Sequence, residues 1–254
     1  MLQSENLTDY PLKNKFSRIL FKISGEALMG DKGFGHDENA IARICKQIIN
    51  AYRQGCEIAI VVGGGNIFRG IAKASEGMER VSADYMGMLA TCINGLALQS
   101  AIEKHGIETR MVSAIAMNTI CEPYIKRKAV RHLEKKRIVI FVAGTGNPFF
   151  TTDTAAVLRA VETGCSAIFK GTQVNGVYSA DPKTNPDAIR YSQINYLDVL
   201  KQELRVIDQT AIALAKDNQL PIVVFSIKNE DALSEVIAGR GTFTIINNQT
   251  TKSC

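Results

Sequence analysis

Residues 137–162 read RIVIFVAGTGNPFFTTDTAAVLRAVE and contain a strand, a loop and a helix in direct succession. The apolar run at residues 137–142 is typical of a strand buried on both faces of a parallel sheet. Thr151 or Thr152 can cap a helix that begins near Asp153. Ligands of open α/β sheets bind where strands end and helices begin, so this stretch predicts both a fold class and a ligand loop.

Similar apolar runs recur along the chain and alternate with segments of helical spacing. This alternation predicts an α/β fold, a three-layer αβα sandwich with a mainly parallel central sheet. Further strands are expected at residues 18–23, 57–62, 108–112, 166–170, 221–225 and 242–246. Helices are expected at residues 37–54 and 82–104, the second with a core-facing side made of Met86, Leu89, Ala90, Ile93, Leu96, Ala97 and Ala101.

The composition is that of a globular protein, with 46% hydrophobic and 22% charged residues among 254. No run approaches the roughly 18 apolar residues of a membrane span, and the polar first 15 residues do not resemble a secretory signal. Six widely spaced cysteines favour a reducing compartment, so we expect a cytoplasmic protein. The net charge of +5 suits an anionic small substrate, and we expect neither a membrane nor a specific nucleic-acid partner.

The chain is interpreted as one domain with two short terminal segments. Residues 1–17 form an N-terminal extension, residues 18–247 the domain, and residues 248–254 a C-terminal tail. Turn-forming residues are concentrated between Lys170 and Asn195. This favours an N-terminal lobe at about 18–170 and a C-terminal lobe at about 171–247.

Two glycine-containing loops directly follow the first two predicted strands. In the first, Lys22 could bring an ammonium group near phosphates, and Ser24 and Gly25 offer accessible backbone N–H groups. In the second, GGGN at residues 63–66 lets the backbone approach a phosphate closely, with Arg69 beyond it. An ordinary strand-end turn remains the alternative for each.

Two further loops follow later strands. The loop at residues 143–153 leads into a helix N-terminus, where hydroxyl groups, free N–H groups and the helix dipole favour an anion. The other begins at Lys170 and continues through Thr172 to Tyr178 and Asp181, which combine a cation, a hydroxyl, a ring and a carboxylate. Turn formation is again the alternative for the second of these loops.

Taken together, the four loops favour phosphoryl transfer, which needs positioned cations more than a nucleophile–base pair. The spacing of the glycines matches neither the GxGxxG dinucleotide fingerprint nor a GxxxxGK[ST] phosphate loop. His36, His105 and His132 all lie outside the loops, which argues against histidine-based acid–base chemistry.

Several longer motifs identify a resemblance. KISGEAL, GFG, VVGGGNIFRG, DYMGMLAT, AGTGNPFFTTDTAA and NGVYSADP occur in this order between about residues 18 and 246. The series resembles the uridylate-phosphorylating members of the amino acid kinase family, and GTGNPFFTTD is specific to them. The resemblance implies the amino acid kinase fold and ATP-dependent phosphorylation of UMP to UDP in pyrimidine nucleotide biosynthesis. It also implies Mg²⁺ carried by ATP without dedicated protein ligands, and a homo-oligomer, expected to be a hexamer.

Site residues follow from the same motifs, position by position. The resemblance implies catalytic roles for Lys22, Arg69, Asp153 and Lys170. It implies ATP binding by Lys22, Ser24, Gly25, Gly65, Arg69, Thr172, Tyr178 and Asp181. It implies UMP binding by Gly64, Asp84, Thr145, Gly146, Asn147, Pro148, Phe149, Phe150, Thr151 and Thr152.

Some positions depart from the family pattern. Asn175 stands where the family more often has Asp, so a contact on the ATP side is expected to differ. The family is allosterically regulated, commonly activated by GTP and inhibited by UTP, and Arg110 lies where a regulatory surface is expected. Gln99, Glu103 and Lys126 differ from the Arg, His and Trp found there, so we expect UTP inhibition without GTP control.

Two alternative functions remain. One is a kinase of the same family that acts on an acyl or another phosphate acceptor, and the other is a non-catalytic nucleotide sensor.

Overall fold

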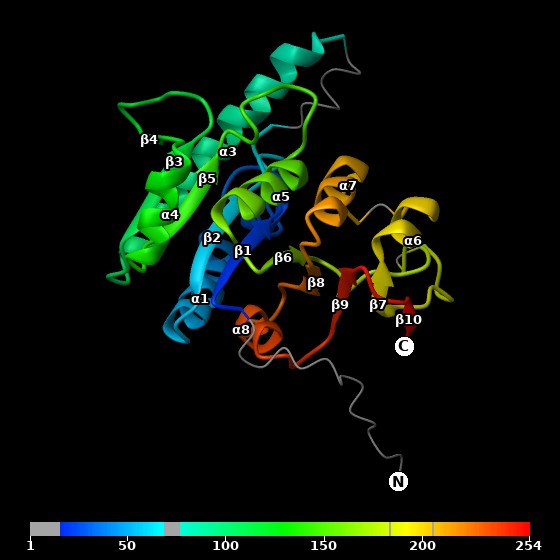
Figure 1. Cartoon of the computed structure of the whole chain (residues 1–254). Coiled ribbons are helices and arrows are strands. Elements are labelled where there is room, and N and C mark those ends of the chain that lie inside the picture. Colours follow the sequence, from blue (N-terminus) through cyan, green and yellow to red (C-terminus); the bar gives the residue numbers. More distant parts are fainter. Residues whose placement is uncertain (1–15, 69–76, 183, 205) are drawn as a thin grey trace.

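The computed structural model describes residues 16–68, 77–182, 184–204 and 206–254. One ten-stranded sheet runs through the molecule in the order β10-β7-β9-β8-β6-β1-β2-β5-β3-β4 (Figure 1). Its strands are β1 (Arg18–Ile23), β2 (Glu57–Val62), β3 (Thr109–Ser113), β4 (Glu122–Pro123), β5 (Ile138–Val142), β6 (Ala167–Thr172), β7 (Tyr191–Asn195), β8 (Ile222–Ser226), β9 (Phe243–Asn247) and β10 (Lys252–Ser253).

Helices cover both faces of this sheet, so the three-layer αβα prediction is confirmed. They are α1 (Glu38–Arg53), α3 (Arg80–Glu103), α4 (Lys126–Glu134), α5 (Thr152–Thr163), α6 (Tyr196–Lys201), α7 (Gln209–Asp217) and α8 (Ala232–Ile237), with a short 3₁₀ helix η1 (Gly25–Leu28). Figure 1 shows α5 and α7 side by side on one face. None of the helices within the described ranges is long and apolar enough to cross a membrane.

Two separate hydrophobic cores explain the layers. Successive residues of a strand point to opposite faces, so Ile19 and Phe21 of β1 enter one core and Leu20 enters the other. The first core receives side chains from α1, α3 and α8, and the second from α4, α5, α6 and α7. Because both faces of the central strands are buried, these strands have apolar residues at nearly every position. They could therefore be predicted from continuous apolar runs in the sequence.

Most sheet contacts are parallel, as predicted. The exceptions among the named strands are the β8–β9 and β7–β10 pairs, which are antiparallel. β4, β7 and β10 were not predicted; β7 reads YSQIN and β10 reads KS, and such polar sequences give no apolar run to detect. Residues 252–253, within the expected C-terminal tail, pair with β7 at the edge of the sheet.

The predicted helix at residues 82–104 exists as α3, but the predicted core-facing side was wrong. Met86, Leu89, Ile93 and Leu96 are 43–50% exposed, whereas Ala90 is buried. The buried side instead contains residues such as Met88, Thr91, Asn94 and Leu98. The helix has apolar residues on both sides, so periodicity alone could not decide which side faces the core.

Candidate active site

Two lysines lie side by side at the carboxyl end of the central strands. β1 and β6 are parallel neighbours, and their register pairs Lys22 with Lys170. Both are buried, with exposed fractions of 8% and 9%. Two ammonium groups are costly to bury together unless an anion lies between them. A carboxylate or a phosphate is therefore required at this point.

Asp153 supplies that carboxylate from the first turn of α5. Its Oδ1 lies 2.7 Å from Lys22 Nζ, and its Oδ2 lies 2.5 Å from Lys170 Nζ. Thr151 is the N-cap of α5 and accepts a hydrogen bond from Asp153 N at 3.0 Å, which fixes the start of the helix. The helix dipole further stabilises a carboxylate in this first turn.

The charges of the three groups are strongly coupled. Burial disfavours the charged form of Asp153, but the ammonium groups of Lys22 and Lys170 outweigh it and hold the pKa of the carboxyl well below its usual range. Burial lowers the pKa of Lys170, with the nearby ammonium of Lys22 acting in the same direction and Asp153 opposing both. One carboxylate thus contacts two cations, and the nearby Asp208 also favours the charged form of Lys170.

The glycines of the first two loops allow the loops to pack against each other. A Cβ on Gly25 would lie 2.6 Å from Asn66 Oδ1 and 2.7 Å from the carbonyl oxygen of Gly63. A Cβ on Gly64 would lie 2.8 Å from the carbonyl oxygen of Gly87 in α3. Side chains cannot be accommodated at these separations, so glycine is required at both positions.

The loop at residues 143–150 borders a cavity of about 220 Å³ together with α3. Gly64, Asp84, Phe150, Thr151 and Thr152 line it. Phe149 has φ +70°, a left-handed conformation that is unfavourable for a bulky residue. Its N–H donates to Asp84 Oδ2 at 2.8 Å, which holds the loop in this conformation.

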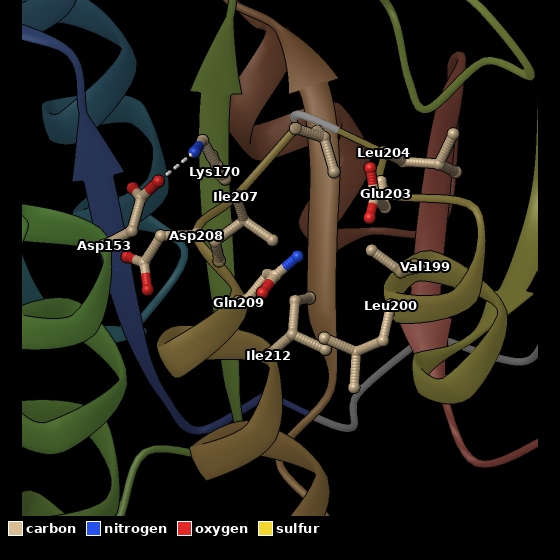
Figure 2. A pocket seen from close by; sticks show the side chains of 11 residues that line it. Asp153, Lys170, Val199, Leu200, Glu203, Leu204, Ile207, Asp208, Gln209 and Ile212 are labelled. Carbon is tan, nitrogen blue, oxygen red and sulfur yellow. Dashed lines mark hydrogen bonds and ion pairs between the residues drawn. The ribbon is translucent and has the colours of Figure 1, made fainter.

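A second pocket of about 460 Å³ opens on the other side of α5. In Figure 2, Asp153, Lys170 and Asp208 lie at one end of it. The apolar side chains of Leu200 and Leu204 lie at the other end. Glu203 also lies at this second end, so the leucine side chains there have a carboxylate beside them.

Asp208 connects the two pockets. It is the N-cap of α7 and accepts a hydrogen bond from Ala211 N at 2.8 Å. Its carboxylate also accepts hydrogen bonds from Thr151 Oγ1 at 2.5 Å and Thr154 Oγ1 at 3.0 Å. Thr151 lines the smaller cavity and Asp208 the larger one, so the N-termini of α5 and α7 form the wall between them.

The structure brings together many of the predicted residues. Lys22, Asp153 and Lys170 are in direct contact, and Gly25 packs against the loop that contains Gly65. Arg69 lies outside the described residues. Several predicted residues do not line either cavity: Thr145, Gly146, Asn147, Pro148 and Phe149 of the loop after β5, Thr172, Tyr178 and Asp181 of the segment after β6, and Lys22, Ser24, Gly25 and Gly65.

Sequence reasoning missed several residues of the two cavities. Arg80 donates to both carboxylate oxygens of Asp84 at 2.9 and 2.8 Å, one helical turn away, and lines the smaller cavity. Asp208 could have been found, because an aspartate directly before the helical pattern at residues 209–217 is a natural N-cap. Thr91 carried no such signal, since it lies within an apolar helix.

The residues present fit a metal carried by a ligand better than one held by the protein. Among the described residues, no group of three or more His, Cys, Asp or Glu side chains could hold a metal ion. Both oxygens of Asp153 contact lysines. Asp208 offers a carboxylate at the charged end of the larger pocket. A magnesium ion bound mainly through phosphates is compatible with this donor set.

Comparisons with known proteins agree with this geometry. The sequence profile of the amino acid kinase family matches residues 17–226. The uridylate kinase of Wolbachia sp. subsp. Brugia malayi is 60% identical over 235 residues, covering 92% of this chain and 95% of that protein. The uridylate kinase of Paramagnetospirillum magneticum is 57% identical over 234 residues, covering 92% and 98%.

A solved structure is also closely similar. The crystal structure of UMP kinase from Bacillus anthracis superimposes with a TM-score of 0.91 at 38% sequence identity. The match covers 94% of this chain and 99% of that one.

Proposed function

The chain belongs to the amino acid kinase family, and we propose that it is a UMP kinase that transfers the γ-phosphoryl group of ATP to UMP. The product is UDP, which places the reaction in pyrimidine nucleotide biosynthesis. The observation that carries the proposal is the contact of Lys22, Asp153 and Lys170, of which Asp153 and Lys170 line the larger pocket. Relatives named uridylate kinase, 57–60% identical over most of the chain, support the choice of acceptor.

UMP is proposed to bind in the smaller cavity. Asp84 would accept hydrogen bonds from the ribose hydroxyl groups, and Gly64 would let the backbone approach the phosphate. Thr151 and Thr152 lie at the N-terminus of α5, where the dipole and free N–H groups favour an anion. Residues 145–150 would then lie beside the nucleotide, since the loop runs from Gly144 to Phe150 and both of these residues line the cavity.

ATP is proposed to bind in the larger pocket. Leu200 and Leu204 at one end offer an apolar surface for a base, and Lys170 at the other end offers a cation for a triphosphate. Ser24, Gly25 and Gly65 would contact the phosphates from the neighbouring loops. Thr172, Tyr178 and Asp181 belong to the segment after β6, and we propose that they contact the nucleoside from the C-terminal lobe at 171–247.

The proposed reaction is a direct in-line transfer. An oxygen of the UMP phosphate attacks the γ-phosphorus as the bond to the β-phosphate oxygen breaks. Lys22 and Lys170 stabilise charge on the transferred group, Arg69 steadies the phosphates, and Asp153 keeps both lysines oriented. No general base is needed, because a phosphate monoester is already largely ionised at pH 7. A magnesium ion bound to ATP would offset charge on the phosphates.

We also propose that the protein is a cytoplasmic homo-oligomer, with a hexamer as the expected state. The support on this chain is the exposed side of α3, where Met86, Leu89, Ile93 and Leu96 repeat at helical intervals. No charged residue occurs between Asp84 and Glu103. The spacing of the four residues is symmetric about position 91. An antiparallel second copy would therefore set Met86 against Leu96 and Leu89 against Ile93.

Regulation is proposed to act through the UMP site. UTP shares the uracil and ribose of UMP, so it can compete at the smaller cavity. Gln99 and Arg110 line a separate surface pocket of about 580 Å³. Arg110 there lies 3.4 Å from Glu108 and 3.9 Å from Glu122. These carboxylates would repel the phosphates of GTP, which supports the expectation of weak or absent GTP activation.

The test is an ADP-release assay with MgATP and a panel of acceptors. UMP, CMP, dTMP and AMP are compared, with N-acetylglutamate as the acyl control. Turnover largely confined to UMP supports the proposal. Turnover of the acyl acceptor would overturn the assignment of the 143–153 loop to UMP. Nucleotide binding without ADP release for any acceptor would favour a non-catalytic sensor.

A further inference from the structure

The inner face of α3 carries two polar side chains that are almost fully buried. Thr91 is 2% exposed and Asn94 is 0% exposed, among apolar neighbours such as Met88 and Leu98. Buried polar groups destabilise a protein unless they are hydrogen-bonded. Both side chains are hydrogen-bonded, and their partners include the backbone of the two loops that border the smaller cavity.

Asn94 fixes the loop that follows β2. Its Nδ2 donates to the carbonyl oxygen of Gly63 at 2.7 Å and to Asn66 Oδ1 at 2.7 Å. Its Oδ1 accepts from Asn66 Nδ2 at 3.1 Å and lies 2.7 Å from His36 Nε2. The amide thus holds both ends of the loop at residues 63–66, while Gly64 in the middle packs directly on α3.

Thr91 fixes the start of the loop that follows β5. Its Oγ1 accepts a hydrogen bond from Ala143 N at 2.8 Å and donates to the carbonyl oxygen of Met88 at 2.7 Å. Ala143 has φ +60°, a left-handed conformation that is unfavourable for alanine. The hydroxyl group is therefore positioned to hold Ala143 in this conformation, from which the rest of the loop extends.

We infer that Thr91 and Asn94 are positioning residues for phosphoryl transfer, which keep the two substrate loops at a fixed separation. The inference rests on the proposed function. The two residues are three positions apart on one face of a rigid helix, a rise of about 4.5 Å along its axis. Each residue is hydrogen-bonded to the backbone of one loop, so α3 sets the distance between the two loops. A misplacement of about 1 Å in a reacting group can lower a rate by about 100-fold.

Thr91 allows a test that separates this role from simple packing. Thr91→Val keeps the side-chain volume and removes the hydroxyl group, whereas Thr91→Ser keeps the hydroxyl group and removes a methyl group. We expect kcat/KM for UMP to fall about tenfold or more in the valine variant, with KM for ATP within about twofold of the wild type. The serine variant should retain wild-type kcat/KM even though it also loses thermal stability.

Thr163→Val is the matched control. Thr163 is also a buried threonine in a helix and donates to the carbonyl oxygen of Arg159 at 2.6 Å, but its hydroxyl contacts neither substrate loop. Thr163→Val should lower the melting temperature about as much as Thr91→Val does, and it should leave kcat/KM for UMP unchanged.

Asn94→Leu tests the second half of the inference, with Gln47→Met as its control. Gln47 is a fully buried amide in α1 that donates to the carbonyl oxygen of Ile227 at 2.9 Å. Because the loop at residues 63–66 lies between both proposed substrates, Asn94→Leu should lower kcat by about tenfold or more and raise KM for both. Gln47→Met should leave kcat and both KM values unchanged. The variants are compared at equal folded fraction, measured by circular dichroism.

The outcomes separate the possible failures. If Thr91→Val and Thr91→Ser lose kcat/KM equally, or if Thr163→Val loses as much as Thr91→Val, the positioning role is wrong and both threonines only stabilise the fold. If the wild-type chain shows no UMP-dependent ADP release, the proposed function has failed before the variants are compared. If Asn94→Leu does not fold, the Thr91 series still decides the question.

Discussion

At the scale of single residues, the central feature is one carboxylate shared by two buried lysines. Asp153 contacts Lys22 and Lys170 through different oxygens. The contacts hold the ammonium groups in place before a substrate arrives, and such preorganisation is a main source of catalytic power in phosphoryl transfer. In the proposed reaction both ammonium groups would therefore meet the transferred phosphate from positions that Asp153 already holds.

Replacing Lys22 by methionine should separate catalysis from folding. We expect kcat to fall by about 100-fold or more, because a positive charge near the transferred group is lost. Asp153 retains its contact with Lys170, so the folded state should persist by circular dichroism. Lys216→Met, at the end of α7 beside Asp217, is the control and should retain activity. Unchanged turnover in Lys22→Met would exclude the proposed role.

The depressed pKa of Asp153 predicts a pH dependence of stability. The unfolded carboxyl titrates near 3.8, whereas the folded group stays ionised to lower pH. The stabilising contribution is therefore complete above the unfolded pKa and is lost as pH falls toward the folded pKa. Urea unfolding between pH 2 and pH 6 should show a steeper loss of the free energy of unfolding below pH 3.8 in the wild type than in Asp153→Asn. Asp187→Asn, at an exposed position in a loop, should keep the wild-type slope.

The sequence predicted the residues that meet at the centre of the site, but not those that hold them. Lys22, Lys170 and Asp153 follow strand ends or begin a helix, where position along the chain indicates position in space. Asn94 gave no comparable signal, because its role depends on which face of α3 is buried. That choice is made by tertiary packing against residues distant in the sequence.

At the scale of elements, α3 separates two environments. Its inner face contacts the loops after β2 and β5, and its outer face carries exposed apolar side chains. The central strands were predictable because both of their faces are buried. By contrast β7, at YSQIN, lies near the edge of the sheet and has too few apolar residues to be recognised.

The close contact between α3 and the loop at Gly64 predicts a sensitive position. In Gly64→Ala, the new methyl carbon would lie 2.8 Å from the carbonyl oxygen of Gly87 and 2.9 Å from Ala90 Cβ. The loop must then shift away from α3, and we expect kcat/KM for UMP to fall by about 100-fold. Steady-state kinetics measures this, with the melting temperature as a control for folding. If Gly64→Ala kept the wild-type kcat/KM, the loop at Gly64 could shift without any effect on the reaction, and the prediction would be wrong.

At the scale of the whole molecule, the exposed side of α3 predicts how copies associate. Charges placed at Leu89 and Ile93 should be buried against a second copy and prevent its binding. We expect light scattering after size exclusion to show a lower mass for Leu89→Lys with Ile93→Lys than for the wild type. Leu197→Lys, at a similarly exposed leucine on α6, is the control and should keep the wild-type mass. An unchanged mass in the double variant would place the interface elsewhere.

The pairing of β1 with β6 also has a consequence for folding kinetics. Lys22 and Lys170 are neighbours across the sheet but about 150 residues apart in the sequence. Contacts of such long sequence separation form slowly, because a large loop must close before they contribute. During refolding, helical signal should therefore return before activity does. A chain that has formed most of its helices would still lack the proposed catalytic centre until β1 has paired with β6.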